Sequence, residues 1–153
     1  MFTIWLSGPK FSGKTSLAKS LNAKFLEGGW EIELLDKDFF GGLEKDILFK
    51  DNAMISYLCK VLNDHNMICV VSGDIPVSER EKVRAIVGRD VFVLVYLSCS
   101  KEVLQSRSLG FGEFVDEGDR YVDMVLDTSK CDIFECTKIL RDYVLNKFNI
   151  FIS

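Results

Sequence analysis

The residues from Gly8 to Thr15 have the types and the spacing that bind a phosphate chain. They satisfy the pattern G-x-x-x-x-G-K-[ST] and come directly after the apolar run 2–6. Glycine at both fixed positions permits backbone conformations that a Cβ would hinder, so successive backbone N–H groups can point at one anion. The helix expected next adds the positive end of its dipole. We therefore predict an ATP-binding P-loop made of Gly8, Pro9, Lys10, Phe11, Ser12, Gly13, Lys14, Thr15 and Ser16.

Two side chains of this motif are expected to act on phosphate and metal. Lys14 would reach the β- and γ-phosphates as a mobile positive charge, and the Thr15 hydroxyl would ligate Mg²⁺. The alternative, a glycine-rich turn that binds nothing, is weak here. An apolar strand signal precedes the motif, and residues 16–26 follow it with the apolar spacing of a helix. The three signals together favour phosphate binding.

Alternating strand and helix signals predict an α/β fold around this loop. The middle strands are continuous apolar runs, which is typical of strands buried on both faces of a parallel sheet. Helices on both faces of that sheet follow from the alternation. We expect one domain over residues 1–153. The predicted strands are 2–6, 30–35, 67–71, 91–97 and 122–126, and the predicted helices are 16–26, 53–62, 78–87, 101–107 and 133–148.

Polar side chains follow two of these strands. Asp36, Lys37 and Asp38 come after the second strand, and Asp74 ends the sequence Ser-Gly-Asp after the third. The carboxyl ends of strands face the ligand crevice of an α/β sheet. We therefore expect these side chains near the P-loop.

The composition limits the classes of partner. The net charge is −4, hydrophobic residues make up 48%, and no run of Lys and Arg exceeds two. A basic surface for nucleic acid is therefore not expected, and the apolar runs are too short to span a bilayer. The five cysteines form no C-x-x-C pair, which indicates reduced thiols without a metal or disulfide role. We expect a cytoplasmic protein with a small-molecule substrate, and neither a nucleic acid nor a membrane as partner.

Residues 108–119 combine glycine, charge and two phenylalanines. Three glycines among charged residues predict a mobile connector, and in a P-loop kinase this is the place for a lid that closes on ATP. The alternative is an ordinary surface loop.

Together these pieces resemble the adenylylsulfate kinase family. The similarity lies in the strand that leads into the P-loop, in Leu-Asp-Lys-Asp at 35–38 where the family has L-D-G-D, and in Asp-Met-Val-Leu-Asp-Thr-Ser at 123–129. The resemblance implies a three-layer P-loop NTPase fold with a five-stranded parallel sheet of order 2-3-1-4-5. It also implies transfer of the γ-phosphate of ATP to the 3′-hydroxyl of a nucleotide, and usually a homodimer.

The resemblance implies roles for single residues as well. Asp38 matches the second acidic position of L-D-G-D, near the acceptor hydroxyl and magnesium. Arg107 matches an arginine at the start of the family's lid, which contacts the ATP base and phosphates, and Thr128 matches a residue of the adenine pocket. The expected catalytic residues are Lys14, Asp38 and Arg107, and the expected magnesium ligands are Thr15 and Asp38.

The acceptor half departs from the family pattern. Lys37 replaces the glycine of L-D-G-D, and residues 49–54 stand in place of a longer stretch, F-S-x-x-D-R-x-E-N-x-R-R, without either arginine pair. Asp74 begins the segment that replaces S-P-Y-R. Phe39 and Phe40 could stack on a base, although either is equally well a core residue. The remaining candidates for acceptor binding are Asp36, Lys37, Phe39, Phe40, Lys50, Asp74 and Arg80.

Two functions follow from these features. The first is an ATP-dependent kinase that acts on adenylylsulfate or on a related nucleotide such as cytidine diphosphoramidate, the acceptor of similar kinases in capsule pathways. The second is a nucleotide-binding module that has lost its acceptor site and acts as a sensor or through a partner. The missing arginines favour the module. The acidic residues at 36 and 38 and the glycine-containing loop at 108–119 favour the kinase, because a binding module needs neither.

Overall fold

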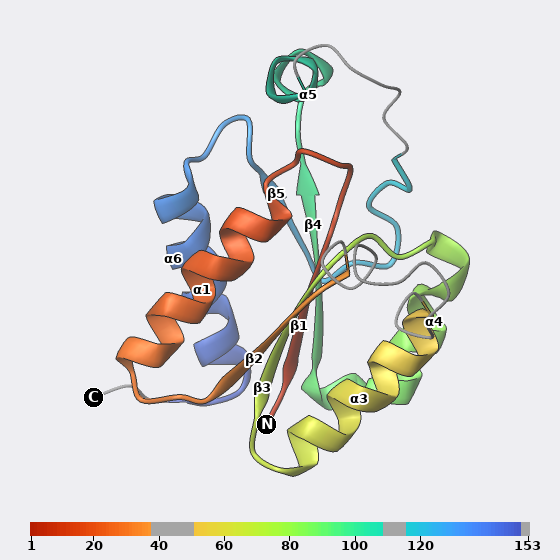
Figure 1. Cartoon of the computed structure of the whole chain (residues 1–153), viewed down its shortest axis with the longest axis vertical. Coiled ribbons are helices and arrows are strands. Elements are labelled where there is room, and N and C mark those ends of the chain that lie inside the picture. The colour runs from red at the N-terminus through yellow and green to blue at the C-terminus, as the bar shows by residue number, and fades with distance from the viewer. Residues whose placement is uncertain (38–50, 109–115, 151–153) are drawn as a thin grey trace.

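The computed structural model describes residues 1–37, 51–108 and 116–150. Strands and helices alternate along the chain (Figure 1). The strands are β1 (Thr3–Ser7), β2 (Ile32–Asp36), β3 (Ile68–Ser72), β4 (Phe92–Ser98) and β5 (Met124–Asp127). The helices are α1 (Lys14–Glu27), α3 (Asn52–Asp64), α4 (Val77–Val87), α5 (Lys101–Arg107), α6 (Ile133–Lys147) and the 3₁₀ turn η2 (Arg89–Val91).

The five strands form one parallel sheet in the order β2-β3-β1-β4-β5. The central strand β1 pairs Thr3 with Cys69 of β3 and with Phe92 of β4. Parallel neighbours require crossovers, which the helices provide. The α/β fold class and the strand order 2-3-1-4-5 are therefore confirmed.

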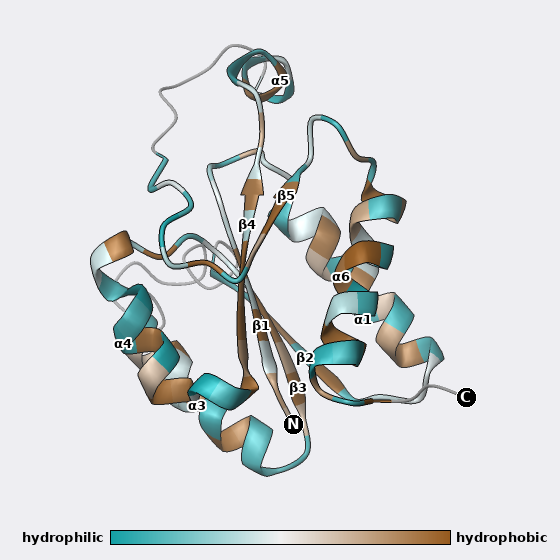
Figure 2. Ribbon diagram, turned by 180° about the vertical axis from the view of Figure 1, so that it is seen from behind, coloured by the Kyte–Doolittle hydropathy of each residue, from teal (hydrophilic) through white to brown (hydrophobic). Residues whose placement is uncertain are grey.

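Each face of the sheet has its own apolar core. In Figure 1, α1 and α6 cover one face and α3 and α4 cover the other. Ile4 and Leu6 of β1 pack in the first core, and Trp5 between them packs in the second. All three side chains are completely buried, which explains why β1 is a continuous apolar run and not an alternating one. Figure 2 shows the same arrangement by hydropathy, with brown residues on the strands and on the helix faces that meet them.

The last strand begins later than the sequence pattern predicts. Residues 122–126 were expected to be extended, but β5 starts at Met124. The carboxylate of Asp123 accepts hydrogen bonds from the Leu94 backbone N–H at 2.7 Å and from Arg84 Nη1 at 2.8 Å. A side chain thus occupies the donor on β4 that a strand backbone would use, so regular pairing begins only after it.

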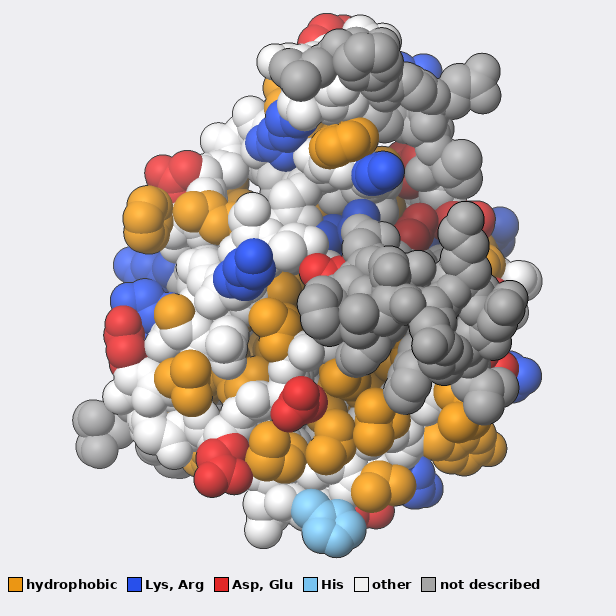
Figure 3. All heavy atoms as spheres, in the orientation of Figure 1, with side chains coloured by type: hydrophobic (Ala, Val, Ile, Leu, Met, Phe, Trp, Pro, Cys, Tyr) orange, Lys and Arg blue, Asp and Glu red, His pale blue; other side chains and the backbone are white. Residues whose placement is uncertain are grey.

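The described surface carries mixed charge. On the face in Figure 3, Lys and Arg side chains are interspersed with Asp and Glu, and among the described residues they form no continuous stripe. Within the same parts of the chain, no helix is both long enough and apolar enough to cross a membrane. All five cysteines are free.

Candidate active site: two cavities at the carboxyl edge of the sheet

The P-loop connects β1 to α1 through backbone conformations that glycine permits. Gly8 has a φ of 138° and Gly13 a φ of 102°. A Cβ on Gly8 would lie 2.6 Å from the Leu97 carbonyl oxygen, so a side chain at that position would force the loop away from β4. Between the glycines, Phe11 also has a positive φ, of 68°, which is uncommon for a residue with a side chain. The loop is therefore held in a strained shape of the kind found at ligand sites.

Lys14 is the first residue of α1, and its ammonium lies against the loop. Lys14 Nζ donates to the Gly8 carbonyl at 2.7 Å and to the Pro9 carbonyl at 2.8 Å. These two contacts hold the charge beside the backbone that surrounds the expected phosphate position. Lysine is a flexible chain with a compact charge, so the ammonium can exchange these carbonyls for phosphate oxygens by rotation of its side chain.

Thr15 meets a carboxylate from the neighbouring strand end. Thr15 Oγ1 donates to Asp36 Oδ2 at 3.1 Å, which joins the first turn of α1 to the last residue of β2. A hydroxyl and a carboxylate are oxygen donors that suit Mg²⁺, which usually takes one or two carboxylates together with water and phosphate oxygens. The donor set at this point therefore fits magnesium. It brings in Asp36, which the sequence analysis assigned to acceptor binding and not to the metal.

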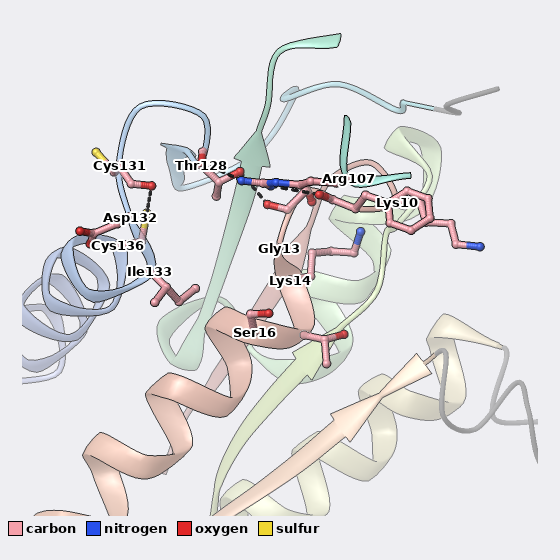
Figure 4. Close-up of a pocket in the computed structure, with 13 residues that line it drawn as sticks. Lys10, Gly13, Lys14, Ser16, Arg107, Thr128, Cys131, Asp132, Ile133 and Cys136 are labelled. Atoms are coloured by element: carbon pink, nitrogen blue, oxygen red, sulfur yellow. Dashed lines mark hydrogen bonds between the residues drawn. The ribbon is translucent and has the colours of Figure 1, made fainter. Parts of the chain in front are cut away.

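The first cavity has a volume of about 540 Å³ and lies beside the P-loop. Arg107, the last residue of α5, crosses its upper side (Figure 4). The guanidinium donates to the Phe11 carbonyl at 3.0 Å and to the Thr128 carbonyl at 3.1 Å. The Thr128 hydroxyl in turn donates to the Ser12 carbonyl at 2.6 Å. Arg107 and Thr128 thus tie the P-loop to the end of β5 through backbone oxygens.

The rest of this cavity comes from residues that the sequence analysis did not select. Its lining includes P-loop residues from Lys10 to Ser16, Arg107 and Thr128, and also Cys131, Asp132, Ile133 and Cys136. The last four belong to the turn after β5 and the start of α6. Their position directly after an expected strand end was the available signal, because ligands bind outside the carboxyl ends of parallel strands. Burial raises the pKa of the Cys136 thiol to about 11, so this thiol stays protonated at neutral pH.

The second cavity has a volume of about 500 Å³ and lies on the other side of the P-loop. Lys10 and Lys14 line both cavities. The shared lysines therefore mark the boundary across which a phosphoryl group could pass. The second cavity is lined by Gly8, Lys10, Lys14, Lys37, Asp51, Asn52, Gly73, Asp74, Pro76, Glu79 and Glu117.

Asp74 supports the entrance of the P-loop as well as lining this cavity. Its Oδ1 accepts from the Gly8 N–H at 3.3 Å and from the Ile75 N–H at 3.0 Å. Burial raises the pKa of the Asp74 carboxyl, against the lowering effect of those two N–H groups and of the Lys14 and Arg80 charges. The carboxyl of Asp74 thus helps to hold the backbone of Gly8 in place.

Arg80 lies behind Asp74 and is completely buried. Its Nε donates to the Ile75 carbonyl at 3.0 Å and its Nη1 to the Arg120 carbonyl at 2.7 Å. Nη2 is 3.6 Å from Asp74 Oδ1, which is an ion-pair distance but too long for a hydrogen bond. Arg80 does not line either cavity, so its described contacts connect Asp74 to the chain that follows the expected lid.

Lys37 reaches into the second cavity from the end of β2. Lys37 Nζ donates to Asn52 Oδ1 at 2.7 Å and to the Asp74 carbonyl at 2.7 Å. Asn52 is the first residue of α3, and Asp51 is the N-cap of this helix, because its side chain accepts from the Ala53 N–H at 2.9 Å. Lys37 therefore joins the ends of two strands to the start of a helix.

Several predicted site residues lie outside the described parts of the chain. These are Asp38, Phe39, Phe40 and Lys50, together with most of the expected lid at 108–119. Their assigned roles stay predictions.

Comparison with known protein sequences gives one family. The family model "Adenylylsulphate kinase" matches residues 1–110. The adenylyl-sulfate kinase of Bacillus velezensis is 28% identical over 94% of this chain and 84% of its own length. The probable adenylyl-sulfate kinase of Pyrococcus abyssi is 37% identical over 62% of this chain and 59% of its own length. The solved Mycobacterium tuberculosis APS kinase in complex with AMPPNP and APS has a TM-score of 0.75 at 20% identity, and the match covers 95% of this chain and 97% of that one.

Proposed function

The chain belongs to the adenylylsulfate kinase family, a family of phosphotransferases that act on a hydroxyl group, and we propose the following reaction for it. The enzyme transfers the γ-phosphate of ATP to a hydroxyl, the 3′-hydroxyl, of adenylylsulfate or of a related nucleotide such as cytidine diphosphoramidate. ATP occupies the first cavity and the acceptor occupies the second.

One observation carries this proposal: the two cavities meet at Lys10 and Lys14. Phosphoryl transfer needs the attacking and leaving oxygens roughly in line, with the charge of the phosphoryl group neutralised between them. Lys14 is the lysine of the phosphate-binding motif, and it borders both cavities. A binding module without an acceptor would have no use for a second cavity of similar volume at this lysine.

The roles of the donor-side residues follow from their contacts. Lys14 leaves the Gly8 and Pro9 carbonyls and contacts the β- and γ-phosphates of ATP. Arg107 and Thr128 keep the P-loop and the end of β5 at a fixed distance around the nucleotide. The chain would hold Mg²⁺ with Thr15 and Asp36, joined by Asp38 as the sequence predicts, and bound magnesium supplies neutralisation of the phosphate charge.

In our proposal, the second cavity binds its acceptor through other side chains than those that normally bind the oxyanions of adenylylsulfate. Sulfate and phosphate oxyanions are normally bound by arginine, whose planar fork meets two oxygens at once. Among the described residues, the second cavity has three lysines and no arginine, beside four carboxylates, those of Asp51, Asp74, Glu79 and Glu117. We therefore expect adenylylsulfate to be a poorer acceptor than at least one other nucleotide with a free 3′-hydroxyl.

A panel of acceptors tests the reaction and its substrate together. The purified chain is incubated with ATP and Mg²⁺, and ADP formation is measured with adenylylsulfate, cytidine diphosphoramidate, cytidine diphosphate and adenosine diphosphate as acceptors. ADP formation that rises with one acceptor supports the kinase. ATP binding without acceptor-dependent ADP formation contradicts it and favours the nucleotide-binding module.

We also propose a lid, a cellular compartment and an oligomeric state for the enzyme. The segment 108–119 acts as the lid over ATP, and the reaction takes place in the cytoplasm, where free thiols stay reduced. A homodimer, which the resemblance implies, is checked by sedimentation equilibrium of the purified chain.

A further inference from the structure

Lys37 is bound in the second cavity in a way that only a glycine at position 73 allows. An ideal Cβ built on Gly73 would lie 2.3 Å from Lys37 Cδ and 2.7 Å from its Cβ and Cγ. Real Cβ atoms do not approach other carbons so closely, so the stem of Lys37 lies directly on the Gly73 backbone. Gly73 also has a φ of 153°, a value that favours glycine. The two residues are complementary in shape.

The backbone under Lys37 is fixed from both sides. The Gly73 N–H donates to the Leu6 carbonyl at 3.0 Å, and the Gly73 carbonyl accepts from Trp5 Nε1 at 2.8 Å. Trp5 is itself completely buried. Neither the N–H nor the carbonyl of Gly73 can rotate without losing a buried hydrogen bond. The backbone at Gly73 is therefore a rigid surface on which the lysine stem packs.

The ammonium of Lys37 is also held in a defined position by hydrogen bonds. It donates to Asn52 Oδ1 and to the Asp74 carbonyl, each at 2.7 Å, and Asn52 is only 5% exposed. Gly8, Lys14 and Asp74 line the same cavity, so a positive charge stands at a defined point on the acceptor side of the transferred phosphoryl group.

We propose that Lys37 is a specificity-determining residue of the acceptor site, whose ammonium contacts a phosphate oxygen of the acceptor nucleotide. This inference rests on the proposed function and adds to it the residue and the chemical group that it recognises. Gly73 and Asn52 act as positioning residues, because they hold the stem and the charge of Lys37 before the acceptor arrives.

Acceptor binding by four variants tests this role without requiring turnover. The full-length chain is saturated with AMPPNP and Mg²⁺, and adenylylsulfate and cytidine diphosphate are titrated separately by calorimetry. Lys37→Met keeps a stem of similar length and removes the charge, so it should weaken binding of the better probe roughly tenfold or more, as for loss of a charged hydrogen bond. Gly73→Ala should also weaken it, although Lys37 is still present, because the new Cβ displaces the stem. Lys60→Met on α3 and Gly29→Ala, with a φ of 82° and nothing within 4 Å, are the matched controls and should bind as the wild type does.

The outcomes separate this inference from the proposed function. Unchanged acceptor affinity in Lys37→Met overturns the inference while the function stands. A Lys37→Met variant that loses AMPPNP affinity and thermal stability to the same degree as acceptor affinity shows a structural role, and also overturns it. If the wild type binds neither probe, a nucleotide acceptor of this class is wrong, and the inference fails together with the proposed function.

Discussion

The two cavities at the carboxyl edge of the sheet are built from different kinds of contact. The first cavity, which we propose binds ATP and call the donor cavity, is closed by contacts to backbone oxygens: Arg107 donates to the carbonyls of Phe11 and Thr128, and Thr128 donates to that of Ser12. The second cavity is called the acceptor cavity, after the ligand that we propose for it. The acceptor cavity is organised by side chains from separate elements, with Lys37 and Asn52 bonded to each other. In the first cavity, a change of side chain is tolerated only where these links to the loop backbone persist. A cavity held by side chains changes its ligand when a few of them are replaced.

This difference accounts for the departures from the family pattern that the sequence resemblance implies. The P-loop needs glycine at two positions and a Lys-Thr pair, and the chain retains all four. The acceptor side has Lys37 where the family has glycine, and the stem of that lysine lies on Gly73. The departures from the family pattern thus lie in the acceptor cavity, where side chains determine which ligand binds.

The largest effect is expected from replacing Lys14, which lines both cavities. Lys14→Ala should reduce kcat by roughly 100-fold or more, because removal of one preorganised group that stabilises the transition state commonly costs that much. The fold should persist, since the Lys14 ammonium contacts loop carbonyls and not the core. Turnover and the melting temperature are measured together. Unchanged turnover would remove Lys14 from the transfer site, and Lys19→Ala on α1 serves as the control.

The next effect compares two carboxylates: Asp36, the last residue of β2, and Asp38, two residues later in the sequence. Asp36→Asn and Asp38→Asn keep the shape of each side chain and remove its charge. Asp36 bonds to Thr15, so its replacement should raise the magnesium concentration required for half-maximal activity. Asp38, which lies outside the described residues, is predicted to orient the acceptor hydroxyl, so its replacement should lower kcat by more than about tenfold. Activity is measured against magnesium concentration for both variants, and identical responses would contradict the division of roles.

Replacement of Arg107 should have a smaller effect that is confined to the donor cavity. Arg107→Ala should raise the KM for ATP roughly tenfold and leave acceptor binding unchanged, because its described contacts join the P-loop to the end of β5. Arg107→Lys should recover little of the loss, since a single ammonium cannot bridge both carbonyls as the planar guanidinium does. Steady-state kinetics with each substrate varied in turn provide the measurement. An equal effect on both KM values would mean that the cavities are not separate.

The fold and the P-loop were predictable because their signals are local in the sequence, whereas Cys131, Asp132, Ile133 and Cys136 of the first cavity were not predicted. Continuous apolar runs identified the buried strands, and fixed spacing identified the P-loop. The acceptor cavity depends on contacts between distant residues, such as Lys37 with Asn52 and Asp74, and no periodicity encodes these. Arg80 was a candidate for acceptor binding, and nothing in the sequence indicated that its side chain is completely buried. The link between Asp36 and Thr15 likewise depends on how α1 and β2 pack.

The smallest expected effect concerns Asp74, which lines the second cavity and accepts a hydrogen bond from the Gly8 N–H of the P-loop. Burial raises the pKa of its carboxyl above the ordinary 3.8, since it outweighs the N–H groups of Gly8 and Ile75 and the charges of Lys14 and Arg80. The folded protein therefore holds this proton to a higher pH than the unfolded chain does. The resulting stabilisation is complete below the unfolded pKa and is lost as the pH rises through the folded value.

Asp74→Asn removes this titration and keeps an oxygen that can accept from Gly8. The free energy of unfolding of the wild type minus that of the variant should therefore fall as the pH rises from about 4 through the folded pKa, and should stay constant above it. Urea unfolding of both proteins between pH 3.5 and 7 measures this difference, and Asp64→Asn at the end of α3 is the control. If the difference rises with pH, Arg80 and the two N–H groups stabilise the carboxylate more than burial destabilises it. In that case Asp74 is a charged anchor of the P-loop, and the acceptor cavity begins with a fixed negative charge beside Lys14.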